Sequence, residues 1–358
     1  MFEMKDKDMA KEIIDRLRGM NLDIKLMHVC GTHQDTLVKH GLIDMLDEVG
    51  VEVRQGPGCP VCVTTPQEIE ETLALARSGK TIAIFGDMLK VPGPSGSLLK
   101  AKGQGADVRV VYGINEAVTL AQETDNEVVF IAVGFETTAP STAAILQSRP
   151  PENFSVLCCH RTIPEALRIL VTSGNVKIQG LIEPGHVSVI TGSDMYNFLS
   201  TDYGIPQVIA GFEPLDVLMG VFMLARQIQN GEAKVENAYP RAVTPQGNRK
   251  AQAVMESVFE PCDVKWRGFP VLPGTGLRLK SDYVKWDART RFSEILAPVY
   301  ETEYTEPPGC RCGEVLRGEM EPQECPLFGN KCIPASPVGP CMVSFEGGCA
   351  IEYKYRRK

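Results

Sequence analysis

The sequence lacks any apolar run that approaches the roughly 20 residues of a membrane-spanning helix. Its first twenty residues are charged throughout, so they lack the apolar core of a secretory signal. They instead predict an amphipathic helix with Met9, Ile13, Ile14 and Leu17 on one side. The chain also lacks excess positive charge, because 37 basic residues against 45 acidic ones give a net charge of −8. These absences predict a cytoplasmic protein that binds neither membranes nor nucleic acid.

Cysteine, by contrast, is abundant, with twelve residues in a chain of 358. In a reducing compartment this number indicates metal or redox chemistry rather than structural disulfides. Half of the cysteines lie near the C-terminus, most of them beside proline or glycine. These six are Cys310, Cys312, Cys325, Cys332, Cys341 and Cys349.

The C-terminal segment has too few apolar side chains to form its own core, so its thiols must hold it together. Six thiols could form three disulfides, a zinc site or an iron–sulfur cluster. The paired CxxC knuckles of zinc ribbons are missing, since a C-x-C is followed by spacings of 12, 6, 8 and 7 residues. Irregular cysteines on loops favour a [4Fe–4S] cube, which needs four thiolates and leaves two that could pair. A disulfide-stapled tail and a zinc site are the alternatives.

Residues 25–230 alternate short apolar runs with helical patterns, which is typical of βαβ units. Most runs are nearly continuous, as expected for parallel strands covered on both faces. The predicted strands are Lys25–Cys30, Val51–Gln55, Thr81–Gly86, Val108–Tyr112, Glu127–Val133, Phe154–Cys159, Ile178–Glu183 and Gln207–Gly211. The predicted helices include Gln34–Glu48, Gln67–Arg77, Ile114–Glu123 and Glu213–Gln229.

The predicted fold class is α/β, with two small doubly wound parallel-sheet domains that face a cleft. The eight strands divide into two sets of four, which places these domains at residues 1–125 and 126–230. A single eight-stranded barrel is the competing topology. Beyond residue 231 a helix near Asn248–Phe259 and the Pro/Gly-rich stretch VLPGTGLRL predict a packing and linker segment, residues 231–300. A cysteine-rich iron–sulfur module, residues 301–358, follows it.

Function in a parallel α/β sheet gathers at the carboxyl ends of the strands. The loops predicted there are rich in small and reactive residues. They read Cys30-Gly31-Thr32-His33, Gly56-Pro57-Gly58-Cys59-Pro60-Val61-Cys62, Phe85-Gly86-Asp87-Met88, Val91-Pro92-Gly93-Pro94, Gly134-Phe135-Glu136-Thr137-Thr138 and Pro184-Gly185-His186. Because both predicted domains contribute loops, we expect the site to lie in the cleft between them.

Cys59 and Cys62 form a CxxC at the predicted start of a helix. There the helix dipole and free backbone N–H groups stabilise a thiolate. Two thiols at this spacing can close and reopen a disulfide, which favours a redox role. Half of a zinc knuckle is the alternative, although no second CxxC accompanies it.

Cys30 and His33 share a tight turn at the end of the first predicted strand. A thiolate three residues from an imidazole can ligate iron, or the imidazole can activate the thiol as a nucleophile. An inert buried thiol is the competing interpretation of Cys30. Three further cysteines, Cys158, Cys159 and Cys262, are interpreted as structural.

The set of loops, closed by the six C-terminal cysteines, resembles the family of [NiFe]-hydrogenase maturation factors called HypD. The resemblance runs in order from about residue 25 to Cys349. It implies a redox-active scaffold for metal-centre assembly rather than an enzyme of metabolism. Such proteins carry the Fe(CN)2CO group while it is built, together with the chaperone HypC, and receive cyanide from HypE.

By position in the family pattern, Cys30 corresponds to the cysteine that binds the transient iron with its CN and CO ligands. A cysteine of HypC is the expected co-ligand. Cys59 and Cys62 correspond to the redox-active pair, and His33 to a histidine that orients a ligand or moves a proton. One departure is Asp35, where many bacterial relatives carry a second histidine.

The resemblance also implies how the C-terminal thiols are divided. Cys310, Cys325, Cys332 and Cys349 would ligate the [4Fe–4S] cluster, with 14, 6 and 16 residues between them. Cys312 and Cys341 would form an adjacent redox pair. Two rival functions remain, namely a cluster-dependent thiol–disulfide reductase acting on a thioredoxin-like protein and a structural protein with a zinc-binding tail.

Overall fold

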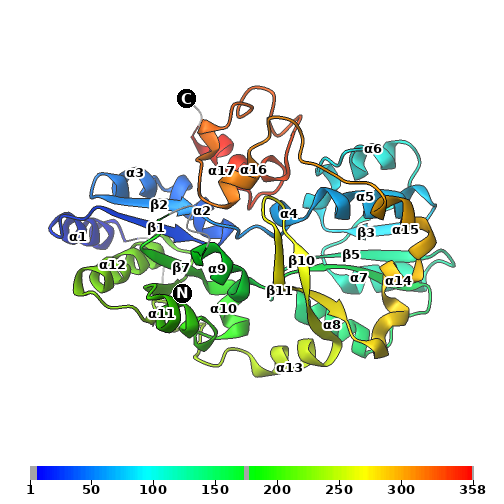
Figure 1. The fold of residues 1–358 in the computed structure, drawn as a ribbon, viewed down its shortest axis with the longest axis horizontal. Helices are drawn as coiled ribbons and strands as arrows, with labels where there is room; N and C mark the ends of the chain where they lie inside the picture. Colours follow the sequence, from blue (N-terminus) through cyan, green and yellow to red (C-terminus); the bar gives the residue numbers. More distant parts are fainter. Residues whose placement is uncertain (1–5, 173–176, 357–358) are drawn as a thin grey trace.

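The computed structural model describes residues 6–172 and 177–356, and its strands form three sheets (Figure 1). The first sheet has five parallel strands in the order β2–β1–β7–β8–β9. The second has four parallel strands in the order β4–β3–β5–β6, and the third is the antiparallel hairpin β10–β11. The strands span Ile24–His28 (β1), Val51–Gln55 (β2), Thr81–Ile84 (β3), Val108–Val110 (β4), Val128–Gly134 (β5), Phe154–His160 (β6), Gly180–Pro184 (β7), Gln207–Ala210 (β8), Val235–Asn237 (β9), Phe259–Lys265 (β10) and Val271–Leu279 (β11).

All eight predicted strands are present, but they are grouped differently from the prediction. The chain forms β1 and β2 of the five-stranded sheet, builds the whole four-stranded sheet, and then returns to form β7, β8 and β9. The boundary predicted between residues 125 and 126 therefore cuts through the four-stranded sheet, because β3 pairs with β5 across it. Two open sheets also replace the competing eight-stranded barrel.

The continuous apolar runs have the burial that parallel strands require. Every residue of β5 and of β6 is buried, since helices or the hairpin cover both faces of the four-stranded sheet. A single hydrophobic core continues from this sheet into the five-stranded sheet and the C-terminal segment. It includes Leu157, Leu181 and Leu316, so the three regions share one interior.

The predicted helices are present, with one interruption. The pattern over residues 34–48 forms two helices, because Gly41 between them adopts a left-handed conformation with φ of +66°. The main helices of the α/β part are α1 (Lys7–Arg18), α2 (Gly31–Lys39), α3 (Leu42–Asp47), α4 (Pro60–Val63), α5 (Pro66–Arg77), α6 (Leu98–Gly103), α7 (Ile114–Gln122), α8 (Ala139–Gln147), α9 (Ile163–Thr172), α10 (Gly185–Thr191), α11 (Asn197–Tyr203), α12 (Pro214–Asn230), α13 (Arg249–Val258), α14 (Ala288–Arg291) and α15 (Ser293–Tyr300).

The stretch VLPGTGLRL is a strand, not the linker that its proline and glycines suggested. It forms β11, which pairs with β10 and carries the buried Leu272 and Leu277. Gly274, with φ of +68°, lies opposite the register shift between Cys262 and Val264. Glycine within a strand often marks such an irregularity. The glycines also interrupt the alternation of apolar residues by which a strand is predicted from sequence.

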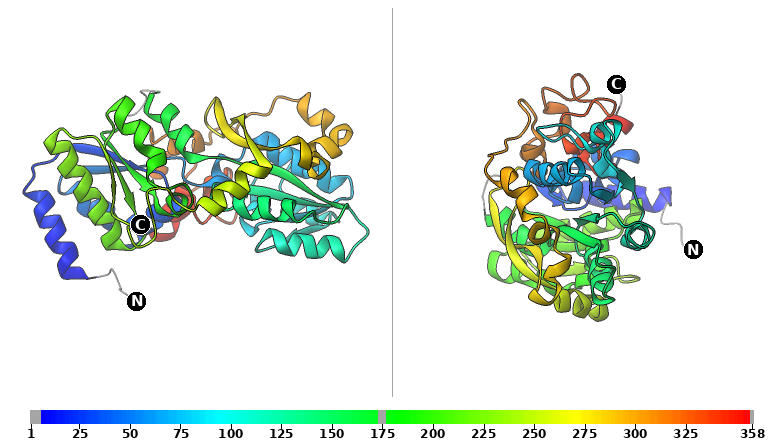
Figure 2. Two further views of the ribbon diagram at one scale, coloured as in Figure 1. Left: turned by 90° about the horizontal axis from the view of Figure 1, so that it is seen from below. Right: turned by 90° about the vertical axis from the view of Figure 1, so that its right-hand side faces the viewer.

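Helix α1 packs against α12 at the end of the molecule far from the four-stranded sheet (Figure 2). Ile13, Ile14 and Leu17 are buried as predicted, whereas Met9 is 46% exposed. Residues 1–5 of the predicted N-terminal helix lie outside the described part of the chain. None of the helices within residues 6–172 and 177–356 is long and apolar enough to cross a membrane.

We call residues 301–356 the cysteine-rich module and the described residues before them the α/β body. The module lies over the junction of the two parallel sheets, near α2 and α4 (Figure 1). Its short helices are α16 (Cys312–Leu316), η4 (Pro322–Glu324), η5 (Pro340–Met342) and α17 (Gly348–Tyr355).

Candidate functional site

Cys30 lies where β1 ends and α2 begins, in the N-cap position of that helix. Its side chain is buried at the junction of the body and the module. Burial and the neighbouring Glu346 carboxylate raise the pKa of the Cys30 thiol to about 11. The thiol therefore keeps its proton at neutral pH, and a bound metal ion would be needed to displace it.

Two glycines allow other segments to reach Cys30. A Cβ atom on Gly58 would lie 2.3 Å from the Cys30 backbone nitrogen, so the loop before Cys59 packs directly on Cys30. A Cβ atom on Gly31 would lie 2.5 Å from the Cβ and carbonyl oxygen of Glu346 in the module. Only hydrogen fits at these two positions, and three segments distant in sequence therefore meet at one thiol.

His33 is fully buried in the first turn of α2. Its Nε2 lies 2.9 Å from the carbonyl oxygen of Gly211 and 3.3 Å from that of Ala210, so Nε2 carries the proton and donates. Nδ1 finds no hydrogen-bond partner within the described residues. Burial lowers the pKa of His33 to about 3, which leaves a neutral ring with one free lone pair.

Cys59 and Cys62 are joined by a disulfide at the start of α4. Their Cα atoms are 5.2 Å apart, and neither residue has solvent-exposed surface. The short helix α4 contacts both α16 and η5 of the module. These two helices carry Cys312 and Cys341, so the disulfide faces the module rather than solvent.

The C-terminal cysteines surround one small cavity. Arg311, Leu327, Phe328 and Met342 complete its wall. Five of the six cysteines line it, and Cys341 does not. The five are Cys310, Cys312, Cys325, Cys332 and Cys349.

This donor set is compatible with a [4Fe–4S] cube. A cube has one cysteine on each of its four irons, so its thiolates stand apart around a shared volume. Cysteines distributed around an enclosed, mostly apolar cavity satisfy that requirement.

Cys312 lies at the centre of the C-terminal cysteines. Its Sγ lies 3.4 Å from that of Cys310, and it also bonds with Cys341 and Cys349. These hydrogen bonds hold the pKa of the Cys312 thiol well below its ordinary value. A thiol that ionises easily beside Cys341 is chemically suited to thiol–disulfide exchange.

Further contacts fasten the module to the body around Cys30. The Ser344 hydroxyl donates to Asp87 Oδ2 at 2.9 Å, which ties the module to the loop after β3. Burial raises the pKa of Glu346 to about 7, and the nearby Asp87 adds to the effect. Glu346 belongs to none of the predicted site motifs, although the two glycines after it indicate a segment that packs closely on its neighbours.

Other cysteine, histidine and glutamate side chains near the strand ends have structural partners. The Cys158 thiol donates to the Leu277 carbonyl at 3.1 Å, which agrees with a structural role. His186 stacks on Phe212 with ring centroids 3.7 Å apart, and Glu136 accepts a hydrogen bond from the Ile163 backbone at 2.9 Å. Glu213 forms a capping box with Asp216 at the start of α12.

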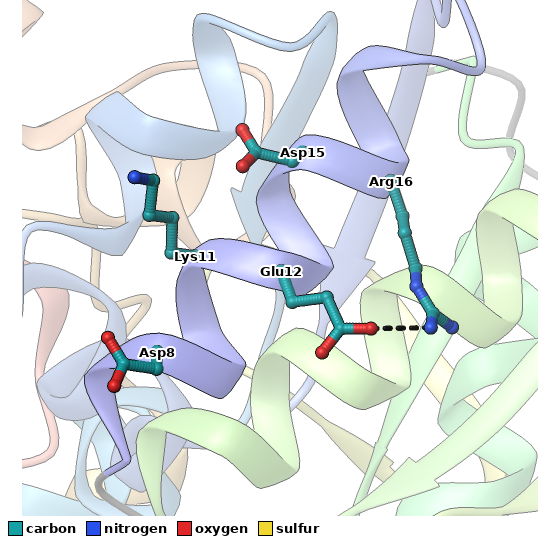
Figure 3. A pocket seen from close by; sticks show the side chains of 5 residues that line it. All are labelled: Asp8, Lys11, Glu12, Asp15 and Arg16. Atoms are coloured by element: carbon teal, nitrogen blue, oxygen red, sulfur yellow. Dashed lines mark hydrogen bonds and ion pairs between the residues drawn. The ribbon is translucent and has the colours of Figure 1, made fainter.

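A surface pocket on the outer side of α1 does not belong to this site. Exposed charged side chains of a single helix line it, and an ion pair joins Arg16 to Glu12 (Figure 3). It contains no thiol or buried group. Its lining residues are Asp8, Lys11, Glu12, Asp15 and Arg16.

Comparison with known proteins identifies the family. The profile described as "HypD: Hydrogenase formation hypA family" matches residues 6–356. The chain belongs to the HypD family.

Similar members of the HypD family come from archaea and bacteria. A hydrogenase expression/formation protein of Methanocaldococcus jannaschii is 47% identical over 364 residues, which covers 100% of both chains. The hydrogenase maturation factor HypD of Escherichia coli is 44% identical, covering 94% of this chain and 90% of its own. That of Cupriavidus necator is 41% identical, covering 99% and 96%.

Proposed function

We propose that this protein is a hydrogenase maturation scaffold on which the Fe(CN)2CO group of [NiFe] hydrogenase is assembled. Membership of the HypD family and the names of its relatives support the general role. The observation that carries the proposal is the meeting of three thiol-bearing segments at one buried junction. The Cys59–Cys62 disulfide and cysteines of the module share one hydrophobic core, and the Cys30 turn packs against the Gly58 loop and against Glu346 of the module.

In this proposal Cys30 holds the iron, which is cargo, with a cysteine of a HypC-like partner as second thiolate. Soft thiolates and a site shielded from water suit iron that carries cyanide and CO. The Nε2 nitrogen of His33 donates to the backbone carbonyls of Ala210 and Gly211, so its Nδ1 nitrogen is unprotonated. His33 lies in the first turn of α2, next to Cys30 at the N-cap. It can accept a hydrogen bond or a proton when a ligand arrives.

Cys310, Cys325, Cys332 and Cys349 would hold a [4Fe–4S] cluster, which supplies electrons one at a time when bound. All four line the C-terminal cavity. Cys312 and Cys341 form the adjacent thiol pair, next to α4 and its disulfide. This arrangement supports a route for electrons between the module and Cys59–Cys62.

The dithiol form of Cys59–Cys62 matches the chemistry of cyanide delivery from a HypE-like thiocyanate. Cleaving the S–CN bond takes two electrons and two protons and yields a thiol and HCN. Oxidation of two thiols to one disulfide releases the same two electrons and two protons. The disulfide form in the structure corresponds to the oxidised end of this exchange.

A thiol–disulfide reductase for a thioredoxin-like protein is the weaker candidate. The Cys59–Cys62 disulfide beside the module favours it, because a cluster could then reduce that pair. A protein disulfide, however, must reach an exposed sulfur for exchange. Both cysteines have no exposed surface, and this burial favours cargo assembly at a protected site.

The test is anaerobic purification with a HypC-like partner, followed by iron, sulfide and zinc analysis and infrared spectroscopy. We expect four iron and four sulfide per chain, plus an extra iron with CN and CO bands. Replacing Cys30 by Ala should abolish those bands and keep the cluster, whereas Cys158→Ala should keep both. CN and CO bands in the Cys30 variant would contradict the assignment, and zinc in place of iron would contradict the whole proposal.

A further inference from the structure

A chain of buried hydrogen bonds connects the Cys30 turn to the module. His28 Nε2, at the end of β1, lies 2.7 Å from Gln34 Oε1 on α2. Gln34 Nε2 in turn donates to Glu352 Oε1 on α17 at 3.1 Å. All three side chains are buried, with exposed fractions of 0%, 3% and 0% in that order. The chain thus crosses the interface between body and module in an interior where lost hydrogen bonds are costly.

The chemistry of Glu352 fixes the direction of every bond in this chain. Burial raises the pKa of Glu352 to about 7, while Arg356 beside it favours the ionised form. The ionised carboxylate only accepts, so in that form Gln34 turns its amide nitrogen toward Glu352. Its amide oxygen then faces His28, and His28 Nε2 must carry the proton. His28 Nδ1 is left as a bare lone pair, which has no hydrogen-bond partner in the described part of the chain.

The module holds Glu352 in place from its other side. Gln323 of η4 donates to Glu352 Oε2 at 2.6 Å, and Arg356 Nε lies 3.4 Å from the same oxygen. Glu352 also lies one helical turn after Cys349, which lines the cysteine cavity. The helix that bears one cavity cysteine therefore also bears the carboxylate that orients Gln34.

Gln34 and His28 lie on either side of Cys30. The Gln34 backbone N–H donates to the Cys30 carbonyl at 3.3 Å, and His28 is two residues before Cys30 at the end of β1. The rings of His28 and His33 meet edge to face, with centroids 6.2 Å apart. A change in the Gln34 side chain therefore alters the hydrogen bonding of His28 before the Cys30 turn and the packing of helix α2 after it.

We propose that Gln34 and Glu352 are positioning residues for Cys30. They hold His28 in the Nε2–H tautomer and fasten the Cys30 turn to α17, so that docking of the module sets the environment of the thiol. The use of this geometry for binding iron rests on the proposed function. The hydrogen-bond chain and the His28 tautomer are independent of that function.

The first test is nitrogen NMR of the holoprotein labelled with 15N-histidine, which reports the protonated nitrogen of each ring. We expect a single Nε2–H tautomer for His28. In Glu352→Leu the Gln34 amide loses its acceptor and is free to turn, so His28 should show both tautomers. In Glu352→Gln the new amide oxygen can still accept, and the single tautomer should be retained.

The second test is the rate at which iodoacetamide labels Cys30, followed by mass spectrometry. Loss of a hydrogen bond to a charged group should raise local opening and the labelling rate about tenfold in Glu352→Leu. Gln34→Met removes the same link from the body side and should have the same effect. Gln323→Leu is the comparison variant, because it removes one bond to Glu352 without touching Gln34 while Arg356 stays beside the same oxygen, so it should change both readouts clearly less than Glu352→Leu.

Two results would overturn the proposal. One is a Glu352→Leu protein with an unchanged His28 tautomer and a Cys30 labelling rate within about twofold of the original. The other is equal loss in Glu352→Leu and Gln323→Leu, which would mean that the module simply detaches. Both readouts are taken on protein free of the Fe(CN)2CO group, so the proposed function can fail while this inference stands, and the reverse also holds.

Discussion

The thiols of the α/β body and those of the cysteine-rich module are positioned by different kinds of structure. Cys30 and Cys59 each occupy the N-cap of a helix that follows a strand of the five-stranded sheet. Strand pairing and core packing fix them, whatever is bound. The module has few regular elements, and η4 and η5 have three residues each. Its thiols surround a cavity instead, so we expect the module to depend more than the body on what binds in that cavity.

The largest expected effect is therefore loss of a thiol that lines the cavity. We expect Cys332→Ala to lose the cluster and to destabilise the module by several kcal/mol, on the order seen when metal binding and folding are coupled. Cys158→Ala, at a buried thiol of the body, should cost only about 1 kcal/mol and keep the cluster. Iron and sulfide analysis with limited proteolysis of residues 301–356 measures both effects. An intact cluster spectrum in the Cys332 variant would remove this residue from the ligand set.

A somewhat smaller effect is expected where the two regions touch. Gly31→Ala would place a methyl group 2.5 Å from Glu346, so either the module or the Cys30 turn must shift. We expect a cost of roughly 1–3 kcal/mol, as for other overpacked sites. Gly103→Ala, at a helical glycine with no neighbouring atom within 4 Å, should instead stabilise by about 0.5–1 kcal/mol. Urea unfolding measures both, and equal behaviour of the two variants would mean that Gly31 is not a contact point.

The same contrast explains what could be predicted from the sequence. All eight strands of residues 25–230 were predicted, because continuous apolar runs are a local signal of buried parallel strands. Their grouping was not, since β1 and β7 are more than 150 residues apart and nothing local marks their pairing. The hairpin strand Val271–Leu279 was missed because proline and glycine dominate its pattern.

The candidate site was predictable where residue type alone carries the chemistry. Cys30, Cys59, Cys62 and the C-terminal cysteines stand out by spacing and by their glycine neighbours. Glu346 and Glu352 do not, because a carboxylate in a polar segment looks like a solvated surface residue. Their importance arises only when the module docks, which leaves Glu352 buried and Glu346 partly buried.

The pH dependence of stability offers a test confined to the body. Glu183 on β7 is fully buried, and neither carboxylate oxygen has a hydrogen-bond partner among the described residues. Burial raises its pKa to about 8, from 4.5 in a solvated chain. The folded state therefore binds a proton that the unfolded state releases, and stability should fall as the pH rises from about 4.5 to about 8.

Replacing Glu183 by Gln should remove this fall, which amounts to roughly 3–5 kcal/mol for a shift of this size. The variant should equal the original protein near pH 4 and exceed it in stability at pH 9. Glu303→Gln, at an exposed residue, is the control and should leave the pH profile unchanged. Urea midpoints at several pH values measure the effect, and parallel profiles for the original protein and Glu183→Gln would show that Glu183 is not buried as a neutral acid.

The smallest effect should come from the hydrogen bond between Ser344 and Asp87. Ser344→Ala removes the bond that links the module to Asp87 after β3, and also the bond that the Ser344 hydroxyl accepts from the Glu346 backbone N–H within the module. The expected cost is about 0.5–1.5 kcal/mol. Because the bond crosses between regions, the loss should appear as faster proteolysis of the module, with little change in global unfolding. Ser148→Ala breaks a bond of similar length within the body, to the Ile145 carbonyl, and should leave module proteolysis unchanged. If both variants open the module equally, the two regions unfold as one cooperative unit, and the separation between a self-sufficient body and a dependent module is wrong.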